Sequence, residues 1–99
     1  MDNYFVKDGK IYLYNENENK FEVLVDEEID FLEGLLNVSY YENKVLFWDE
    51  IGNLLLYDTK TKQYRVFSDA KYNYDVVKKE LYIITKDKDE KKLDIEKIK

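Results

Sequence analysis

An internal repeat constrains the fold of this chain more than any other feature. Residues 4–25 align with residues 47–68 at a constant offset of 43 residues. The alignment keeps a glycine, a Leu-Tyr pair and a valine identical, and it places aromatic residues opposite one another, as at Phe5 and Trp48. A repeated supersecondary element predicts layers that stack on their neighbours.

Each repeat has the pattern strand, turn, strand, turn, strand. In the first repeat, Asp8-Gly9 is a hairpin signal because both central residues of a type I′ turn need a positive φ. A two-residue loop at this position pairs Phe5 with Tyr12 and Val6 with Ile11, so both faces of the hairpin are apolar or aromatic. An antiparallel sheet that is wet on one side alternates apolar with polar residues instead. We therefore expect a sheet that is covered on both faces, or one whose aromatic face binds a partner.

The second repeat predicts strands over residues 44–49, 54–58 and 64–67, preceded by a strand over residues 38–41. With a turn at residues 50–53, both faces of its central hairpin are apolar, one carrying Val45, Phe47, Leu54 and Leu56 and the other carrying Leu46, Trp48, Leu55 and Tyr57.

A third, weaker repeat aligns residues 74–85 with residues 4–15 at an offset of 70 residues. Its turn is expected at Lys78-Lys79. Its last strand is expected over residues 92–96, although Leu93, Ile95 and Ile98 also fit one helical turn.

An insertion over residues 26–46 separates the first two repeats. Ile29, Leu32, Leu35 and Leu36 recur at helical spacing, and acidic residues lie at the start of the segment, where the helix dipole favours negative charge. We expect one short helix near residues 27–36, with a strand and a bend as the alternative. The predicted fold is a single, mostly β domain of antiparallel β-meander repeats, with about nine to ten short strands in stacked or propeller-like sheets. Its boundaries are 1–99 for the domain, and 4–25, 47–68 and 74–96 for the repeats.

Residues 52–67 resemble part of a β-propeller blade of the kelch or two-component-regulator type. The shared features are a glycine, an apolar strand ending in Tyr57-Asp58, a Thr/Lys-rich turn and an aromatic residue on the returning strand. Residues 10–25 show the same scheme with Asn15 in place of the aspartate. The double glycine of kelch blades is missing, and ten strands supply only about two and a half blades, whereas a closed propeller has about four or more. The chain therefore either oligomerises into a ring or forms an open stack, and we favour the open stack.

Composition excludes several classes of function. The net charge is −6 and the chain has one arginine, so it is not expected to bind nucleic acid directly. There is no cysteine and no histidine, which removes the usual nucleophile–base pairs and the thiolate metal sites. Asp49, Glu50 and Asp58 sit at strand ends and are interpreted as turn formers rather than as an acid–base pair. We expect no enzyme activity, no cofactor, no metal, no membrane contact and a cytoplasmic location.

The predicted binding surface is aromatic and acidic. Tyrosine and tryptophan dominate protein–protein hot spots because they combine rigid area with a polar tip, although β-propensity alone also places such residues on half-buried strands. The predicted binding residues are Tyr40, Tyr41, Trp48, Asp49, Glu50, Tyr72 and Tyr74.

The expected function is binding of another protein with a basic surface. The size and charge are similar to those of small acidic phage inhibitors, such as CRISPR inhibitors and other anti-defence proteins, and of bacterial immunity proteins. The alternative is a propeller-like homo-oligomer that binds a small ligand, a carbohydrate or a nucleotide, between repeats.

Overall fold

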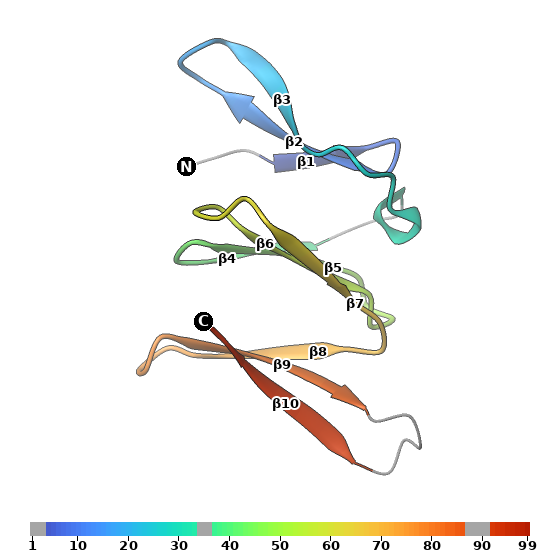
Figure 1. Ribbon diagram of the computed structural model, residues 1–99, viewed down its shortest axis with the longest axis vertical. Coiled ribbons are helices and arrows are strands. Elements are labelled where there is room, and N and C mark those ends of the chain that lie inside the picture. The colour runs from blue at the N-terminus through green and yellow to red at the C-terminus, as the bar shows by residue number, and fades with distance from the viewer. Residues whose placement is uncertain (1–3, 34–36, 87–91) are drawn as a thin grey trace. The chain divides into compact units, whose positions relative to one another are not determined.

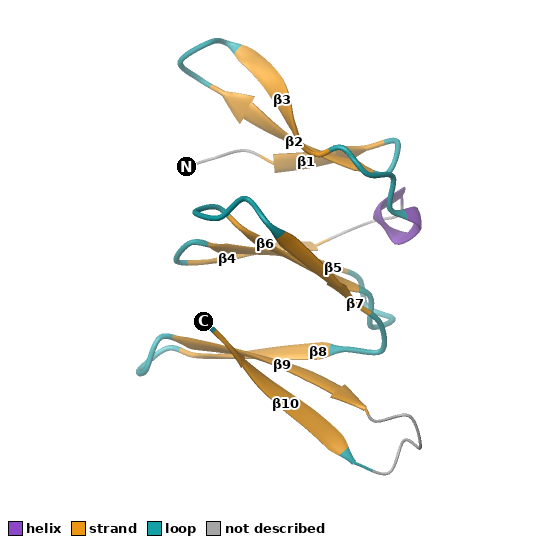
Figure 2. Ribbon diagram, viewed as in Figure 1, coloured by secondary structure: helices purple, strands orange, loops and turns teal. Residues whose placement is uncertain are grey.

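The computed structural model describes residues 4–33, 37–86 and 92–99. The chain divides into two compact units, Met1–Leu36 and Asn37–Lys99. Within the described residues, ten strands form three antiparallel sheets, whose order along the chain can be followed in Figure 1. Figure 2 shows how little of the described chain is helical. The mostly β meander architecture that the repeats predict is therefore confirmed.

The N-terminal sheet has the order β1-β2-β3. Its strands are β1 (Tyr4–Lys7), β2 (Lys10–Asn15) and β3 (Lys20–Val25). Asp8 and Gly9 have φ values of 52° and 74°, as a type I′ turn requires. The predicted pairing of Phe5 with Tyr12 is confirmed, so the hairpin has the expected register.

The segment after β3 contains one 3-10 turn, η1 (Asp30–Glu33). It is much shorter than the helix predicted near residues 27–36, of which residues 34–36 lie outside the described residues. The Ile29 backbone N–H donates to the Gly9 carbonyl at 2.9 Å, and Leu32 is almost fully buried. A Cβ at Gly9 would lie 2.9 Å from Glu28 Cγ, so this turn requires glycine for its close approach as well as for its positive φ.

The second unit begins with a four-stranded sheet of order β4-β5-β6-β7. Its strands are β4 (Asn37–Tyr41), β5 (Lys44–Trp48), β6 (Leu54–Asp58) and β7 (Tyr64–Phe67). The apolar residues of β5 and β6 are buried on both faces, with Trp48 partly buried, which confirms the two-sided apolar pattern.

The predicted grouping of residues on those two faces is wrong. Trp48 pairs with Leu54, so Leu46 and Trp48 share a face with Leu54 and Leu56 rather than with Leu55 and Tyr57. Asp49 belongs to the connection, since its backbone N–H donates to the Asn53 carbonyl at 3.1 Å. Because side chains alternate along a strand, the resulting change of register by one residue exchanges the faces.

The second unit ends with a three-stranded sheet of order β10-β9-β8, formed by β8 (Lys71–Asp75), β9 (Glu80–Lys86) and β10 (Leu93–Ile98). The turn expected at Lys78-Lys79 is longer than predicted, because β8 ends at Asp75. The Asp75 carboxylate accepts hydrogen bonds from the backbone N–H groups of Val77 and Lys78 at 3.0 Å each, which starts the turn early. The C-terminal residues form a strand and not a helical turn.

The two sheets of the second unit pack face to face around one apolar core. Burying one such side chain fully contributes about 1.5–3 kcal/mol. The buried members are Leu46, Leu54, Leu56, Ala70, Leu81 and Ile83. In the part of the chain that the structure describes, no helix has the length and apolar character that a membrane crossing needs.

Candidate functional site

Four of the predicted binding residues meet inside the second unit. Tyr41 stacks on Tyr74 with ring centroids 4.4 Å apart, and it contacts Tyr72 at 5.8 Å. The Trp48 ring meets Tyr72 edge to face at 5.7 Å. All four rings pack against the core between the two sheets and are only partly exposed. Their contacts with one another join the four-stranded sheet to the C-terminal sheet.

Hydrogen bonds fix the polar ends of this aromatic cluster. Trp48 Nε1 donates to Ser39 Oγ at 3.1 Å, and Ser39 Oγ lies 3.1 Å from the Tyr72 hydroxyl. The Tyr41 hydroxyl donates to the Tyr72 hydroxyl at 3.4 Å. Burial, followed by the hydrogen bond to Tyr72, raises the pKa of Tyr41 above its ordinary value. Ser39, which has no distinguishing signal in the sequence, therefore joins Tyr41 in linking the two sheets through the Tyr72 hydroxyl.

Tyr40 lies apart from this cluster. Side chains alternate along β4, so Tyr40 is on the opposite face of the sheet from Tyr41. It is 44% exposed. The structure thus separates the two adjacent tyrosines that the sequence grouped together.

The acidic part of the predicted site is a tightly bonded loop over residues 49–53. The Asp49 carboxylate accepts hydrogen bonds from the Ile51 N–H at 3.1 Å, the Asn53 N–H at 2.9 Å and Asn53 Nδ2 at 2.8 Å. Burial acts to raise the pKa of the Asp49 carboxyl, but these hydrogen bonds outweigh it and hold the pKa below its ordinary value. Asp49 is therefore charged at neutral pH and acts as the organiser of the loop, as the turn-former interpretation predicted.

A glycine anchors this loop to the connection between β7 and β8. Gly52 has a φ of 106°, and its carbonyl accepts a hydrogen bond from the Ala70 N–H at 2.9 Å. A Cβ at Gly52 would lie 3.2 Å from Asp69 Cα, so no larger residue fits without movement of the backbone. The position of the loop is therefore set by its own hydrogen bonds and by this close approach.

A cleft of about 530 Å³ lies beside the loop. Four of the seven predicted binding residues line it, Trp48, Asp49, Glu50 and Tyr72. Asp69 adds a third carboxylate to this surface. Ile51 is 81% exposed within the acidic loop, which makes it an apolar side chain with acidic neighbours.

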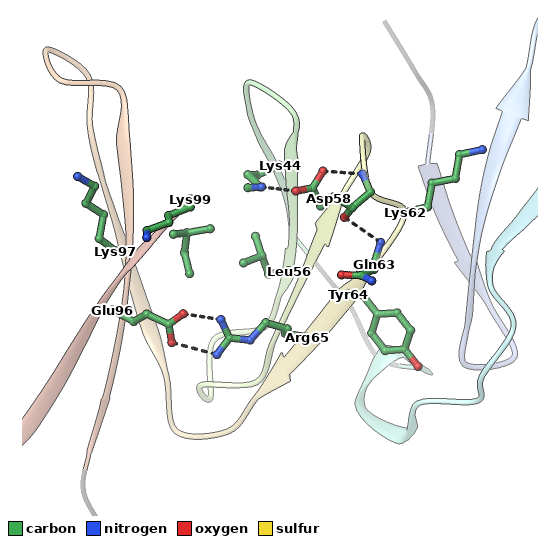
Figure 3. Close-up of a pocket in the computed structure, with 12 residues that line it drawn as sticks. Lys44, Leu56, Asp58, Lys62, Gln63, Tyr64, Arg65, Glu96, Lys97 and Lys99 are labelled. Carbon is green, nitrogen blue, oxygen red and sulfur yellow. Dashed lines mark hydrogen bonds and ion pairs between the residues drawn. The ribbon is translucent and has the colours of Figure 1, made fainter.

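A second cleft, of about 710 Å³, lies between the four-stranded and C-terminal sheets, with Leu56 and Ile98 among its lining residues (Figure 3). Lys44, which is buried, forms an ion pair with Asp58 in this cleft. The other Asp58 oxygen accepts hydrogen bonds from Asn43 Nδ2 and the Lys60 N–H at 3.1 and 2.8 Å. The ion pair, together with these hydrogen bonds, holds the pKa of Asp58 far below its usual range despite the opposing effect of desolvation.

A second ion pair crosses this cleft at its surface. The Arg65 guanidinium donates two hydrogen bonds to the Glu96 carboxylate, one of them at 2.9 Å, and they lower the pKa of Glu96. The cleft is cationic in an otherwise acidic chain. Its charged residues are Lys44, Lys62, Arg65, Lys97 and Lys99, against Asp58 and Glu96. Figure 3 shows Lys62 and Lys97 directed away from the centre of the cleft.

Sequence reasoning did not find the cationic cleft. Arg65 and Glu96 are 31 residues apart and belong to different sheets, so their pairing depends on how the sheets pack. A sequence signal existed only for Asp58, whose place at a strand end before a Thr/Lys-rich turn marks a turn former. Among the described residues, no group of three or more carboxylates is placed to hold a metal ion.

Comparisons with known proteins identify no relative. No family model matches the chain, and neither a curated protein nor a solved structure matches it. The two clefts and the aromatic cluster are therefore the observations on which a function can be argued.

Proposed function

We propose that this chain is a non-enzymatic protein-binding module, a small acidic inhibitor that docks on a basic site of a target protein. One observation carries the proposal: the loop over residues 49–53 presents the exposed Ile51 beside Asp49 and Glu50 in a conformation fixed by hydrogen bonds. An ordered loop loses little conformational entropy on binding. An exposed apolar side chain beside charged residues is compatible with a hot spot that has a polar rim.

The electrostatics favour a basic partner. The chain carries a net charge of −6, and three carboxylates, Asp49, Glu50 and Asp69, line the first cleft against two lysines, Lys71 and Lys86. In this mechanism the carboxylates occupy the positions of nucleic-acid phosphates on the target, and Ile51 fills an apolar recess beside them. Long-range attraction of this kind accelerates association and weakens as salt is added. A cytoplasmic phage anti-defence protein, such as a CRISPR inhibitor, or an immunity-type protein is the setting that best fits this size and charge.

Affinity capture from a host lysate, read by mass spectrometry, tests the proposal with two matched charge reversals. Glu50→Lys should abolish or strongly reduce recovery of the target. Glu16→Lys, at an exposed site in the turn between β2 and β3, makes the same change in net charge and should leave recovery unchanged. Raising the salt concentration should slow association with the recovered target. Equal recovery by both variants would remove the acidic loop from the interface.

The cationic cleft favours a second candidate, a propeller-like module that binds a small ligand between its sheets. Leu56 and Ile98 offer an apolar surface, and the lining carries five cationic side chains against two carboxylates, Asp58 and Glu96, which pair with Lys44 and Arg65. Among the ligands considered, these charges favour a nucleotide over a neutral carbohydrate. Titration calorimetry with ADP and with maltose separates the two: ADP binding that is lost in Arg65→Leu supports the candidate, and no heat with either ligand removes it.

A further inference from the structure

The packing inside the second unit defines two kinds of sheet face. The four-stranded sheet contributes the face that carries Leu46, Trp48, Leu54 and Leu56, which we name the A face. It packs on the face of the C-terminal sheet that carries Tyr72, Tyr74, Leu81 and Ile83, which we name the B face.

The strand pairing shows which side of the four-stranded sheet corresponds to the B face of the C-terminal sheet. Counted from the turn, the Tyr40–Val45 pair of β4 and β5 corresponds to the Tyr74–Leu81 pair of β8 and β9. The face of Val45 in the four-stranded sheet therefore corresponds to the B face. It is the other side of that sheet, the A face, that contacts the C-terminal sheet. The two sheets are thus stacked in the same sense, A on B, as successive layers of a repeat structure are.

The 43-residue offset of the first two repeats, applied to the hairpin of β2 and β3, assigns the faces of the N-terminal sheet. Its Tyr14–Phe21 pair corresponds to the Tyr57–Tyr64 pair of β6 and β7, each one step from a four-residue polar turn. Tyr57 lies on the same side as Val45, with which it is paired. The N-terminal sheet therefore has a B face that carries Phe5, Tyr12, Tyr14, Phe21 and Val23.

This B face is an ordered aromatic surface that is open to solvent. Phe5 stacks on Tyr12 with centroids 5.0 Å apart and an interplanar angle of 7°, and it meets Phe21 edge to face at 4.7 Å. Phe21 is 56% exposed and Val23 is 45% exposed. Exposed apolar patches of this kind mark interaction sites.

The C-terminal sheet exposes the complementary face. Its A face carries Tyr82, Ile84, Leu93 and Ile95, and the last two are 64% and 60% exposed. Lys97 on the same face is paired with Glu80 at 3.4 Å. The N-terminal sheet therefore exposes a B face and the C-terminal sheet exposes an A face. Faces of these two kinds pack on each other inside the second unit.

We propose that two copies of this chain associate head to tail, the aromatic B face of the N-terminal sheet of one copy packing on the A face of the C-terminal sheet of the other. A contact between unlike faces is heterologous, and it closes into a ring when the rotation permits.

Sedimentation equilibrium on the purified chain tests this association. The expected mass at high concentration is twice the 12.1 kDa of one chain. Phe21→Lys and Ile95→Lys should each weaken association at least about thirtyfold, as loss of a hot-spot contact does. Val77→Lys places the same charge on an exposed residue of the β8–β9 turn, outside both faces, and should leave the mass unchanged.

Mixing the two variants distinguishes head-to-tail contact from like-on-like contact. Phe21→Lys retains an intact A face and Ile95→Lys retains an intact B face, so an equimolar mixture should form a 1:1 complex although each variant alone is monomeric. Circular dichroism spectra that match the parent chain confirm that the variants are folded. A parent chain that stays monomeric at every concentration, a Phe21→Lys variant that still dimerises alone, or a mixture without complex would each overturn the proposal.

Discussion

The buried ion pair between Lys44 and Asp58 offers the sharpest test of what holds the second unit together. Asp58→Asn keeps the shape of the side chain and an oxygen for the turn amides of Lys60 and Thr61, but it removes the charge opposite Lys44. Loss of one partner of a buried pair costs about 3–5 kcal/mol. The Lys44 and Asp58 side chains are 10% and 19% exposed, so some water reaches the pair. We therefore expect the free energy of unfolding to fall by about 3 kcal/mol, the lower end of that range.

Urea unfolding followed by the fluorescence of Trp48 measures this loss, since Trp48 is the only tryptophan and lies in the same unit as the pair. With a slope of about 1 kcal/mol per molar urea, the midpoint should fall by about 3 M. The double variant Lys44→Met/Asp58→Asn removes both charges and should recover most of the loss, because a neutral pair leaves no buried charge without a partner. A midpoint within about 0.5 M of the parent chain for Asp58→Asn, or a double variant no more stable than the single one, would refute this reasoning.

Three further predictions concern the candidate site and its supports. Gly52→Ala should lower the free energy of unfolding, measured by thermal denaturation, by about 1–3 kcal/mol. Alanine is strained at a φ of 106°, and its Cβ would lie 3.2 Å from Asp69 Cα. Lys60→Ala, at an exposed position, should have little effect. Tyr72→Phe should cost about 1 kcal/mol through loss of its hydroxyl contacts with Ser39 and Tyr41, and Tyr74→Phe, which keeps its stacking on Tyr41, serves as the control; equal costs would deny the hydroxyl a role. The pKa values of Asp49, Asp58 and Glu96 are lowered in the folded chain, so the unfolded chain takes up protons first as the pH falls. We therefore expect full stability above about pH 5 and a progressive loss of stability below about pH 4. In an acid titration followed by circular dichroism, Asp58→Asn should lose stability less steeply than the parent chain.

Strand positions could be predicted from the sequence wherever a turn has a strong local signal. Asp8-Gly9 fixes a two-residue loop, and both the strand boundaries and the register on either side of it are as expected. The hairpin through Glu42 and Asn43 is confirmed as well, with Glu42 at a φ of 56°. In these cases the backbone conformation of one or two residues decides the register of a whole strand pair.

The predicted strand ends are wrong where an aspartate ends a strand earlier than the alternation of hydrophobic residues suggests. Asp49 and Asp75 each accept hydrogen bonds from backbone N–H groups two or more residues further on. These bonds compete with the hydrogen bonds between strands. A displacement of the strand pairing by one residue moves every side chain of the strand to the opposite face of the sheet. The sequence pattern shows which residues are apolar, but the loop length decides which of them face each other.

The clefts and the aromatic cluster could not be predicted because they depend on contacts between sheets. Ser39 and Tyr72 are 33 residues apart, and only the packing of the second unit brings them together. Trp48, Asp49, Glu50 and Tyr72 are predicted as binding residues from their residue types alone. The structure shows that all four line the same cleft. Whether this surface binds a target is a prediction that the capture experiment addresses.

The meander connectivity has a consequence for how the chain folds. Every strand that the structure describes pairs only with strands next to it in the sequence. Pairings between sequence neighbours close short loops, which gives a low contact order and fast folding for a β protein. Each sheet can therefore be completed while the next is still being synthesised, so little unpaired strand edge is exposed to aggregation on the ribosome.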